Sequence, residues 1–293
     1  MPKQPISSVK KIPFIPIAIA FVFGLLPSAF AQGSLTPPGA PAPTMLTLSQ
    51  VEPRTPVDAV HTPGNGSAEF IIANSGSYYL TTNIIGVSSE NGIAITVGNV
   101  TLDLNGFSLI GPSTANTAIV ISSGTTNVTV RNGMISGWGA FDVGIQASGT
   151  NAAFENLNVS AGYAGIAGGG DGGVIKNCTI SHIAQWGVYI TGPNYLISHN
   201  YFFEDNAGNN GNGAAIFLTS ANNIVEDNHV TGSSPSGFGI LVNGIAGITN
   251  NVIIRNSVLG KAANNYSVSL TANDVGPIGS ASTNSNPQGN ISN

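Results

Sequence analysis

One short apolar segment recurs along this chain at intervals of 21 to 28 residues. Each copy has a small residue, then a branched aliphatic residue, then alternating side chains. The copies occupy 92–97, 118–122, 144–148, 165–169, 187–191, 215–219 and 239–243. A unit of this length cannot bury its apolar face alone, so the repeat predicts a solenoid of stacked coils, and its branched residues favour β-strand.

A second strand-like segment follows each first one and ends in an asparagine. The asparagines are Asn105, Asn132, Asn156, Asn177, Asn200, Asn228 and Asn256. Stacked coils repeat the same turn about 4.8 Å further along the axis, so each amide can donate to its copy and accept from it. Asn also favours turns for local reasons, but the recurrence at coil spacing predicts an Asn ladder, with a register that can shift by one residue between coils.

Charged residues beside these asparagines follow the same spacing. Arg131, Glu155 and Lys176 occupy equivalent positions on three successive coils, and stacking them alternates the sign of the charge. Opposite charges on neighbouring strands favour the native register. We therefore interpret Glu155 as a partner in this column and not as a catalytic acid.

The first 31 residues have the features of a signal peptide. Three lysines precede an apolar stretch from Ile12 to Phe30, and Ala29 and Ala31 offer small residues for cleavage before Gln32. A retained transmembrane anchor is the alternative, and the three prolines within the stretch argue against it. We expect an exported protein, secreted or held at the bacterial cell surface or in the periplasm, with no membrane span after cleavage.

The rest of the chain divides by composition. Residues 32–65 form a Pro-rich leader, 66–274 the repeats and 275–293 a polar C-terminal tail. The net charge of −5 becomes more negative once three lysines leave with residues 1–31, a balance that argues against nucleic acid as a partner. Cys178 is the sole cysteine, so we expect no intrachain disulfide and interpret this residue as a small buried side chain.

The glycine–isoleucine strands, the asparagine turns and the period resemble the right-handed parallel β-helix repeat proteins, the superfamily that includes pectate lyases. The segments SLTPPGAPAPTM, VEPRTP, GSYYLTTNI and VTLDLNGFSLIG resemble a group of secreted bacterial β-helix proteins. The resemblance implies an all-β fold, a right-handed parallel β-helix forming a single-stranded solenoid of about seven to eight coils. Because this superfamily mixes lyases, hydrolases, epimerases and non-enzymatic surface proteins, it implies no single activity.

Strand alternation predicts which residues of the first strands face outward. They are Ala94, Val120, Gln146, Ala167, Tyr189, Phe217 and Leu241, all uncharged. A calcium-dependent lyase needs several carboxylates around the metal and a base, and a hydrolase needs two carboxyl groups across the glycosidic bond. This face supplies neither arrangement, so we lean towards a protein without catalytic activity.

The loops that lead into the first strands carry the remaining candidates. Together with two outward residues, they predict an aromatic groove with a few acids, able to stack on sugar rings. Its residues are Trp138, Asp142, His182, Trp186, Tyr189, Glu204, Asp205 and Phe217, with Phe141 and Tyr163 beside them. In the alternative interpretation the two tryptophans plug coil corners, and the leader or the tail covers the outward row.

Three functions follow. We expect the protein to bind extracellular polysaccharide along the rim of its first sheet, without a cofactor. One alternative is a non-catalytic structural or surface-attachment protein. The other is a calcium-dependent polysaccharide lyase in which Asp142, Glu204 and Asp205 bind calcium and His182 or Lys176 is the base.

Overall fold

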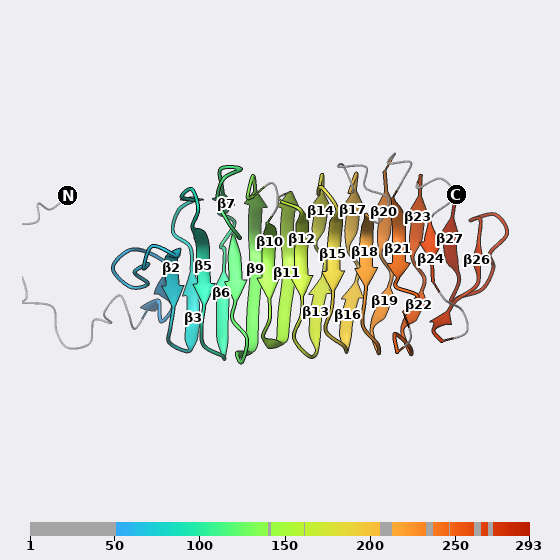
Figure 1. The fold of residues 1–293 in the computed structure, drawn as a ribbon, viewed down its shortest axis with the longest axis horizontal. Helices are drawn as coiled ribbons and strands as arrows, with labels where there is room; N and C mark the ends of the chain where they lie inside the picture. The colour runs from blue at the N-terminus through green and yellow to red at the C-terminus, as the bar shows by residue number, and fades with distance from the viewer. Residues whose placement is uncertain are drawn as a thin grey trace, which may run out of the picture. The chain divides into compact units, whose positions relative to one another are not determined.

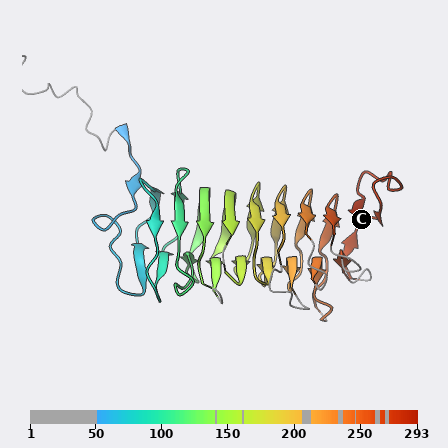
Figure 2. The same ribbon diagram turned by 90° about the horizontal axis from the view of Figure 1, so that it is seen from above.

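The computed structural model describes residues 51–293, except 140–141, 161, 206–212, 233–236, 246, 261–264 and 269–271. Within these residues the chain forms parallel strands that wind in a right-handed β-helix of about eight coils (Figures 1 and 2). The predicted all-β fold and coil number are confirmed. The predicted signal peptide and most of the predicted leader lie outside the described residues, among which no helix is long and apolar enough to cross a membrane.

The first strand of every coil belongs to one nine-stranded parallel sheet. Its strands are β2 (Ala68–Ile72), β5 (Asn91–Ile95), β8 (Ile119–Ile121), β10 (Val143–Ala147), β12 (Ala164–Gly168), β15 (Trp186–Ile190), β18 (Ala214–Leu218), β21 (Phe238–Val242) and β24 (Tyr266–Ser267). The predicted branched residues pair in register from Ile93 on β5 to Ile240 on β21. All of them lie in the interior, as the alternation predicted.

The second and third strands of the coils form an eighteen-stranded sheet. The second strands are β3 (Gly76–Tyr79), β6 (Val100–Asp103), β13 (Gly173–Lys176), β16 (Tyr195–Ser198), β19 (Ile224–Glu226), β22 (Val252–Ile254) and β25 (Asp274–Val275). The third strands are β4 (Ile84–Ile85), β7 (Ser108–Ile110), β14 (Thr179–Ser181), β17 (Tyr201–Phe203), β20 (His229–Thr231) and β23 (Ser257–Leu259). In two coils a single long strand replaces both, β9 (Thr126–Ser136) and β11 (Thr150–Ser160).

The glycine that precedes many of the inward residues allows the coils to stack closely. A Cβ added to Gly144, Gly165 or Gly187 would lie 2.6 Å from a carbonyl oxygen of the next coil. Such a contact is far inside van der Waals distance, so a larger residue would push neighbouring coils apart. The recurring glycine–isoleucine pair therefore combines close backbone approach with a buried branched side chain.

The predicted Asn ladder is confirmed, and its register shifts by one residue between coils, so that its members fall into two adjacent columns. Asn132, Asn156 and Asn177 have positive φ, at 60°, 54° and 54°, and turn towards the surface; Asn105 also has positive φ. In later coils His199, Asp227 and Arg255 take the left-handed position instead. Asn200, Asn228 and Asn256 follow these residues and are buried.

The buried column forms a continuous ladder. Nδ2 of Asn200 donates to Oδ1 of Asn228 at 3.0 Å, Asn228 donates to Asn256 at 2.9 Å, and Asn256 donates to Asn290 at 3.2 Å. Each accepting oxygen also takes the backbone N–H of the preceding asparagine at 3.0 Å. Buried backbone groups thereby find partners where the strand is interrupted.

A second buried ladder, which the sequence analysis missed, precedes the second strands. Nδ2 of Asn223 donates to Oδ1 of Asn251 at 2.9 Å, and Asn251 donates to Asn273 at 2.9 Å. The signal lies in the repeated asparagine pairs before the strands, because the first of each pair, Asn222 or Asn250, has positive φ and the second points inward.

The charged column is confirmed. Arg131 pairs in register with Glu155, and Glu155 with Lys176. Lys176 Nζ lies 3.1 Å from Glu155 Oε1, while Arg131 Nε lies 3.1 Å from Asp103 Oδ2. Glu155 and Lys176 are therefore paired with each other on the second-strand face.

Parts of the predicted leader and of the predicted tail pair with strands of the helix. Within the leader, β1 (Thr55–Pro56) pairs with β3. Within the tail, β26 (Ile278–Gly279) pairs with β27 (Asn290–Ser292), which pairs with β23. Asn290 is fully buried and ends the ladder, so this segment of the predicted tail packs against the last coil.

Candidate ligand-binding site

The outward row of the nine-stranded sheet changes character along the helix. The register aligns Ala94, Val120, Gln146 and Ala167 and continues through Tyr189, Phe217 and Leu241. The row therefore passes from small or flexible side chains to large rings between β12 and β15. This placement of Tyr189 and Phe217 agrees with the predicted alternation.

Four rings gather where the row becomes aromatic. Trp186, at the start of β15, stacks on Tyr189 with ring centroids 4.4 Å apart, and Tyr189 stacks on Phe217 at 5.4 Å. Tyr163 meets Trp186 edge-on at 5.1 Å. All four residues are half-buried, so the cluster combines mutual packing with an outer surface.

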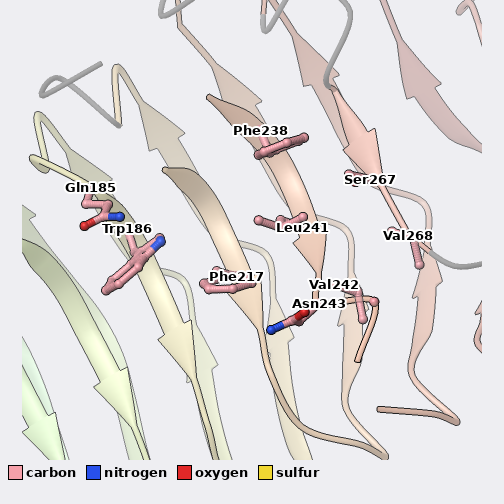
Figure 3. Close-up of a pocket in the computed structure, with 10 residues that line it drawn as sticks. Gln185, Trp186, Phe217, Phe238, Leu241, Val242, Asn243, Ser267 and Val268 are labelled. Carbon is pink, nitrogen blue, oxygen red and sulfur yellow. The ribbon is translucent and has the colours of Figure 1, made fainter. Parts of the chain in front are cut away.

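A hollow of about 530 Å³ adjoins this cluster (Figure 3). Phe217 and Leu241 line it together with Trp186 and Phe238. Its polar side chains include Gln185, Asn243 and Ser267. The volume and the apolar lining with a few polar groups are typical of small-ligand sites, which measure about 300–1,000 Å³.

The side chain of Gln185 is the most notable polar group of the hollow. Its residue is 7% exposed, and among the described residues its Oε1 is a buried acceptor without a hydrogen-bond partner. The backbone holds it in place, because Gln185 N–H donates to Tyr163 O and Gln185 O accepts from Ala214. A buried unpaired amide oxygen costs about 1–3 kcal/mol, and a ligand that reorients the amide and pairs with it would recover that energy.

Trp138 is not part of this site. Its residue is 1% exposed, and a Cβ added to Gly86, Gly92 or Gly111 would overlap its ring. These glycines leave the space that the indole fills inside the helix. The prediction that Trp138 lines a groove was therefore wrong, and the alternative, a tryptophan that plugs a coil corner, describes it correctly.

The three acids predicted to share calcium do not come together. Backbone contacts lead from Asp142 to Tyr163 and from Tyr163 to Gln185, and Asp205 lies one coil further on, beside Ile183. At about 4.8 Å a coil, Asp142 and Asp205 are about 14 Å apart. Among the described residues no three His, Cys, Asp or Glu side chains form a group that could hold a metal.

The individual acids have local partners. Asp205 is 1% exposed, and its Oδ1 accepts the Ile183 N–H at 3.3 Å. Glu204 lies at the end of β17, where its Oε2 is 3.5 Å from His182 Nε2. His182 and Glu204 thus belong to the third-strand edge, Lys176 pairs with Glu155, and Phe141 lies outside the described residues.

Eight residues that line the hollow were not predicted as site residues, among them Gln185, Phe238, Leu241 and Asn243. A signal for Phe238 was present, because it precedes Gly239 as Trp186 precedes Gly187, and the register aligns both with Ala214. Burial of the Gln185 amide depends on contacts between coils, for which the sequence offers no pattern.

Comparisons with known proteins agree with this architecture. The family described as the right handed beta helix region matches residues 143–290. Among solved structures, the crystal structure of Dettilon tailspike protein (gp208) is similar, with a TM-score of 0.53 and 15% sequence identity over 66% of this chain.

The aligned region spans 42% of the tailspike chain, and at this identity the likeness concerns the fold alone. A search of the curated proteins found no match. The family match covers half of the sequence and coincides with the coils that carry the aromatic cluster and the hollow. This chain belongs to the right-handed β-helix family.

Proposed function

We propose that this protein binds an extracellular polysaccharide along the rim of its nine-stranded sheet. The observation that carries the proposal is the hollow beside Trp186, Tyr189 and Phe217, in which stacked rings adjoin a buried amide oxygen that has no hydrogen-bond partner among the described residues. An exported location supports it and rests on the signal-peptide features of residues 1–31.

The chemistry of the hollow suits a sugar ring. The C–H faces of pyranoses pack on aromatic rings, which Phe217 and Trp186 offer, while hydroxyl groups need donors and acceptors. Gln185, Asn243 and Ser267 supply both kinds of group. Because the outward row continues from coil to coil, a chain of sugars lying along the helix axis would meet several of these side chains in turn.

The fold neighbour is compatible with this function. It is named a tailspike protein, which fits a role at a surface, and the tailspike name is the only functional hint from the comparisons. We therefore rest the proposal on the residues of the hollow and not on the likeness.

The direct test is an array of soluble polysaccharides, probed with and without calcium. The double variant Trp186→Ala/Phe217→Ala removes the ring surface, and Val120→Ala is the matched control on the same outward row in an earlier coil. We expect the unaltered protein to bind at least one polysaccharide, the double variant to bind about tenfold or more weakly, and the control to bind normally.

Equal binding by the double variant would remove the hollow as the site. No binding under either condition would favour the second candidate, a structural or surface-attachment protein. The continuous buried Asn ladders favour that candidate, because they hold the coils in one rigid register.

A further inference from the structure

A second set of rings lies outside the hollow, on the third strands. Tyr201 and Phe203 alternate outward on β17 and are 39% and 36% exposed. Their ring centroids are 6.3 Å apart and their planes differ by 17°. Two residues apart on one strand, these rings lie side by side with nearly parallel faces.

Among the described residues, the neighbouring strands cover one face of Tyr201 and leave the other face open. In the register Tyr201 lies between Thr179 and His229. The His229 ring stacks on Tyr201 at 5.5 Å with an interplanar angle of 14°, so it covers one face of the tyrosine. Thr179 is too short to cover the other face, which therefore looks out over β14.

The same step occurs beside Phe203, which lies between Ser181 and Thr231 in register. His182 meets Phe203 edge-on at 5.4 Å and so lies at one end of the Tyr201–Phe203 pair. The earlier members of these two outward rows are smaller or more polar, including Asn158, Ser160 and Ser136 on β11 and β9. Within the described strands, the change from small or polar residues to aromatic rings in these two rows thus occurs at β17.

Polar groups surround the Tyr201–Phe203 pair. Tyr201 Oη and Thr231 Oγ1 are 3.2 Å apart. The imidazole of His182 and the carboxylate of Glu204 lie beside Phe203. Hydroxyl groups of Thr179 and Ser181 lie in register below the two rings. Flat apolar faces bordered by hydroxyl, imidazole and carboxylate groups match a pyranose, which has an apolar face and a polar rim.

We propose that Tyr201 and Phe203 form a second platform for a sugar ring, separate from the hollow. The two sites belong to neighbouring coils, because β17, which carries the platform, pairs with β14, and residues 182–185 connect β14 with β15, which carries Trp186. This turn is fixed by the bonds from Ala184 N–H to Gly162 O and from Gln185 N–H to Tyr163 O. A polysaccharide crossing this edge would meet the platform on one side and the hollow on the other.

Side-chain NMR separates the two sites in one titration of the full chain. Cellohexaose, xylohexaose and a galacturonate hexamer serve as probes, and the ring signals of His182 and His229 report on the platform. The indole N–H of Trp186 reports on the hollow, and His61, which pairs with Asp58 near the start of the helix, is the internal control.

We expect at least one probe to shift the His182 and His229 signals and leave His61 unchanged. The variant Tyr201→Ala/Phe203→Ala should weaken that response about tenfold. Met134→Ala is the matched control, because Met134 is an exposed apolar side chain on the outward row that continues to Tyr201.

The outcomes distinguish this inference from the proposed function. A response of the Trp186 indole with silent His182 and His229 signals would overturn the platform and support the hollow. The reverse pattern would support the platform and count against the hollow. Silence of all three signals towards every probe would overturn the platform as a site for these sugars.

Discussion

The coils before and after Cys178 form the same helix with different interiors and different surfaces. Before it, the position that follows the left-handed residue of the turn is Gly133 or Leu157; after it, this position is Asn200 or Asn228. The surface changes over the same coils, where the outward row passes from small residues to rings.

The difference shows that one corner can be closed in two ways. In the earlier coils β9 and β11 run through the corner as continuous strands, and an aliphatic side chain such as Leu157 fills the interior. In the later coils the strand is interrupted, and the amide of an asparagine takes up the backbone groups that lose their strand partners. The coils that carry the aromatic surface are therefore those whose corners are closed by side-chain hydrogen bonds of buried asparagines.

Asn228→Ala is expected to have the largest effect. It leaves the backbone N–H of Asn200 and the carbonyl of Ile197 without their amide partners in the interior, and it divides the ladder. We expect a loss of about 3–4 kcal/mol in the free energy of unfolding, measured with urea. Asn156→Ala, at an exposed turn with a φ of 54°, should cost only about 1 kcal/mol.

Asn228→Asp is the control for this variant. At low pH its carboxyl group is protonated and keeps an acceptor and one O–H donor, so it should retain more stability than Asn228→Ala. Equal effects of Asn228→Ala and Asn156→Ala would show that the buried ladder does not distinguish the two regions.

Leu157→Ala tests the earlier corner. Leu157 is 2% exposed, so removing its side chain leaves a cavity and should cost about 2–3 kcal/mol. Urea unfolding again measures the effect. A loss below about 0.5 kcal/mol would mean that the continuous strands alone hold this corner.

The fold was largely predictable because each coil repeats the same small residue, branched residue and turn. The register of the ladder was not, because asparagine occurs at both the left-handed position and the inward position. The sequence letters do not tell a turn at Asn177 from one at His199, and only the stacking of whole coils decides which residue faces inward.

The candidate site was predictable only in part. Strand alternation placed Tyr189 and Phe217 outward, since it is a local property. Burial of Trp138 depends on Gly86, Gly92 and Gly111, which lie on earlier segments of the chain, and no local pattern reveals it. The same reason explains why Gln185 was missed.

Cys178 lies at the boundary between the two regions, and its thiol should make the free energy of unfolding depend on pH in the alkaline range. Burial raises the pKa of its thiol from 9.0 to about 11. The unfolded chain releases this proton first, so the thiol should lower the stability progressively as pH rises from 9 to 11. Urea unfolding across this range should show a shallower decline in Cys178→Ser, and identical slopes would contradict the assignment.

The smallest effect is expected at Arg255, on the surface of the later coils. Its guanidinium donates to Asp227 at 2.8 Å and holds the pKa of that carboxyl below its usual value. The resulting stability is present above the ordinary carboxyl pKa and is lost as pH falls through the lower folded value.

We expect Arg255→Gln to lower the free energy of unfolding only slightly near neutral pH and to lose less stability on acidification than the unaltered protein. Unfolding measured at several pH values below neutrality tests this difference. A steeper loss in the variant would contradict the role of Arg255.

Hydrogen exchange with and without the best-bound polysaccharide tests the division between the two regions most directly. The account predicts slower exchange within residues 182–244, where the rings and the hollow lie, and unchanged exchange from β5 to β10. Protection centred on the small outward residues of β5 to β10 would contradict it.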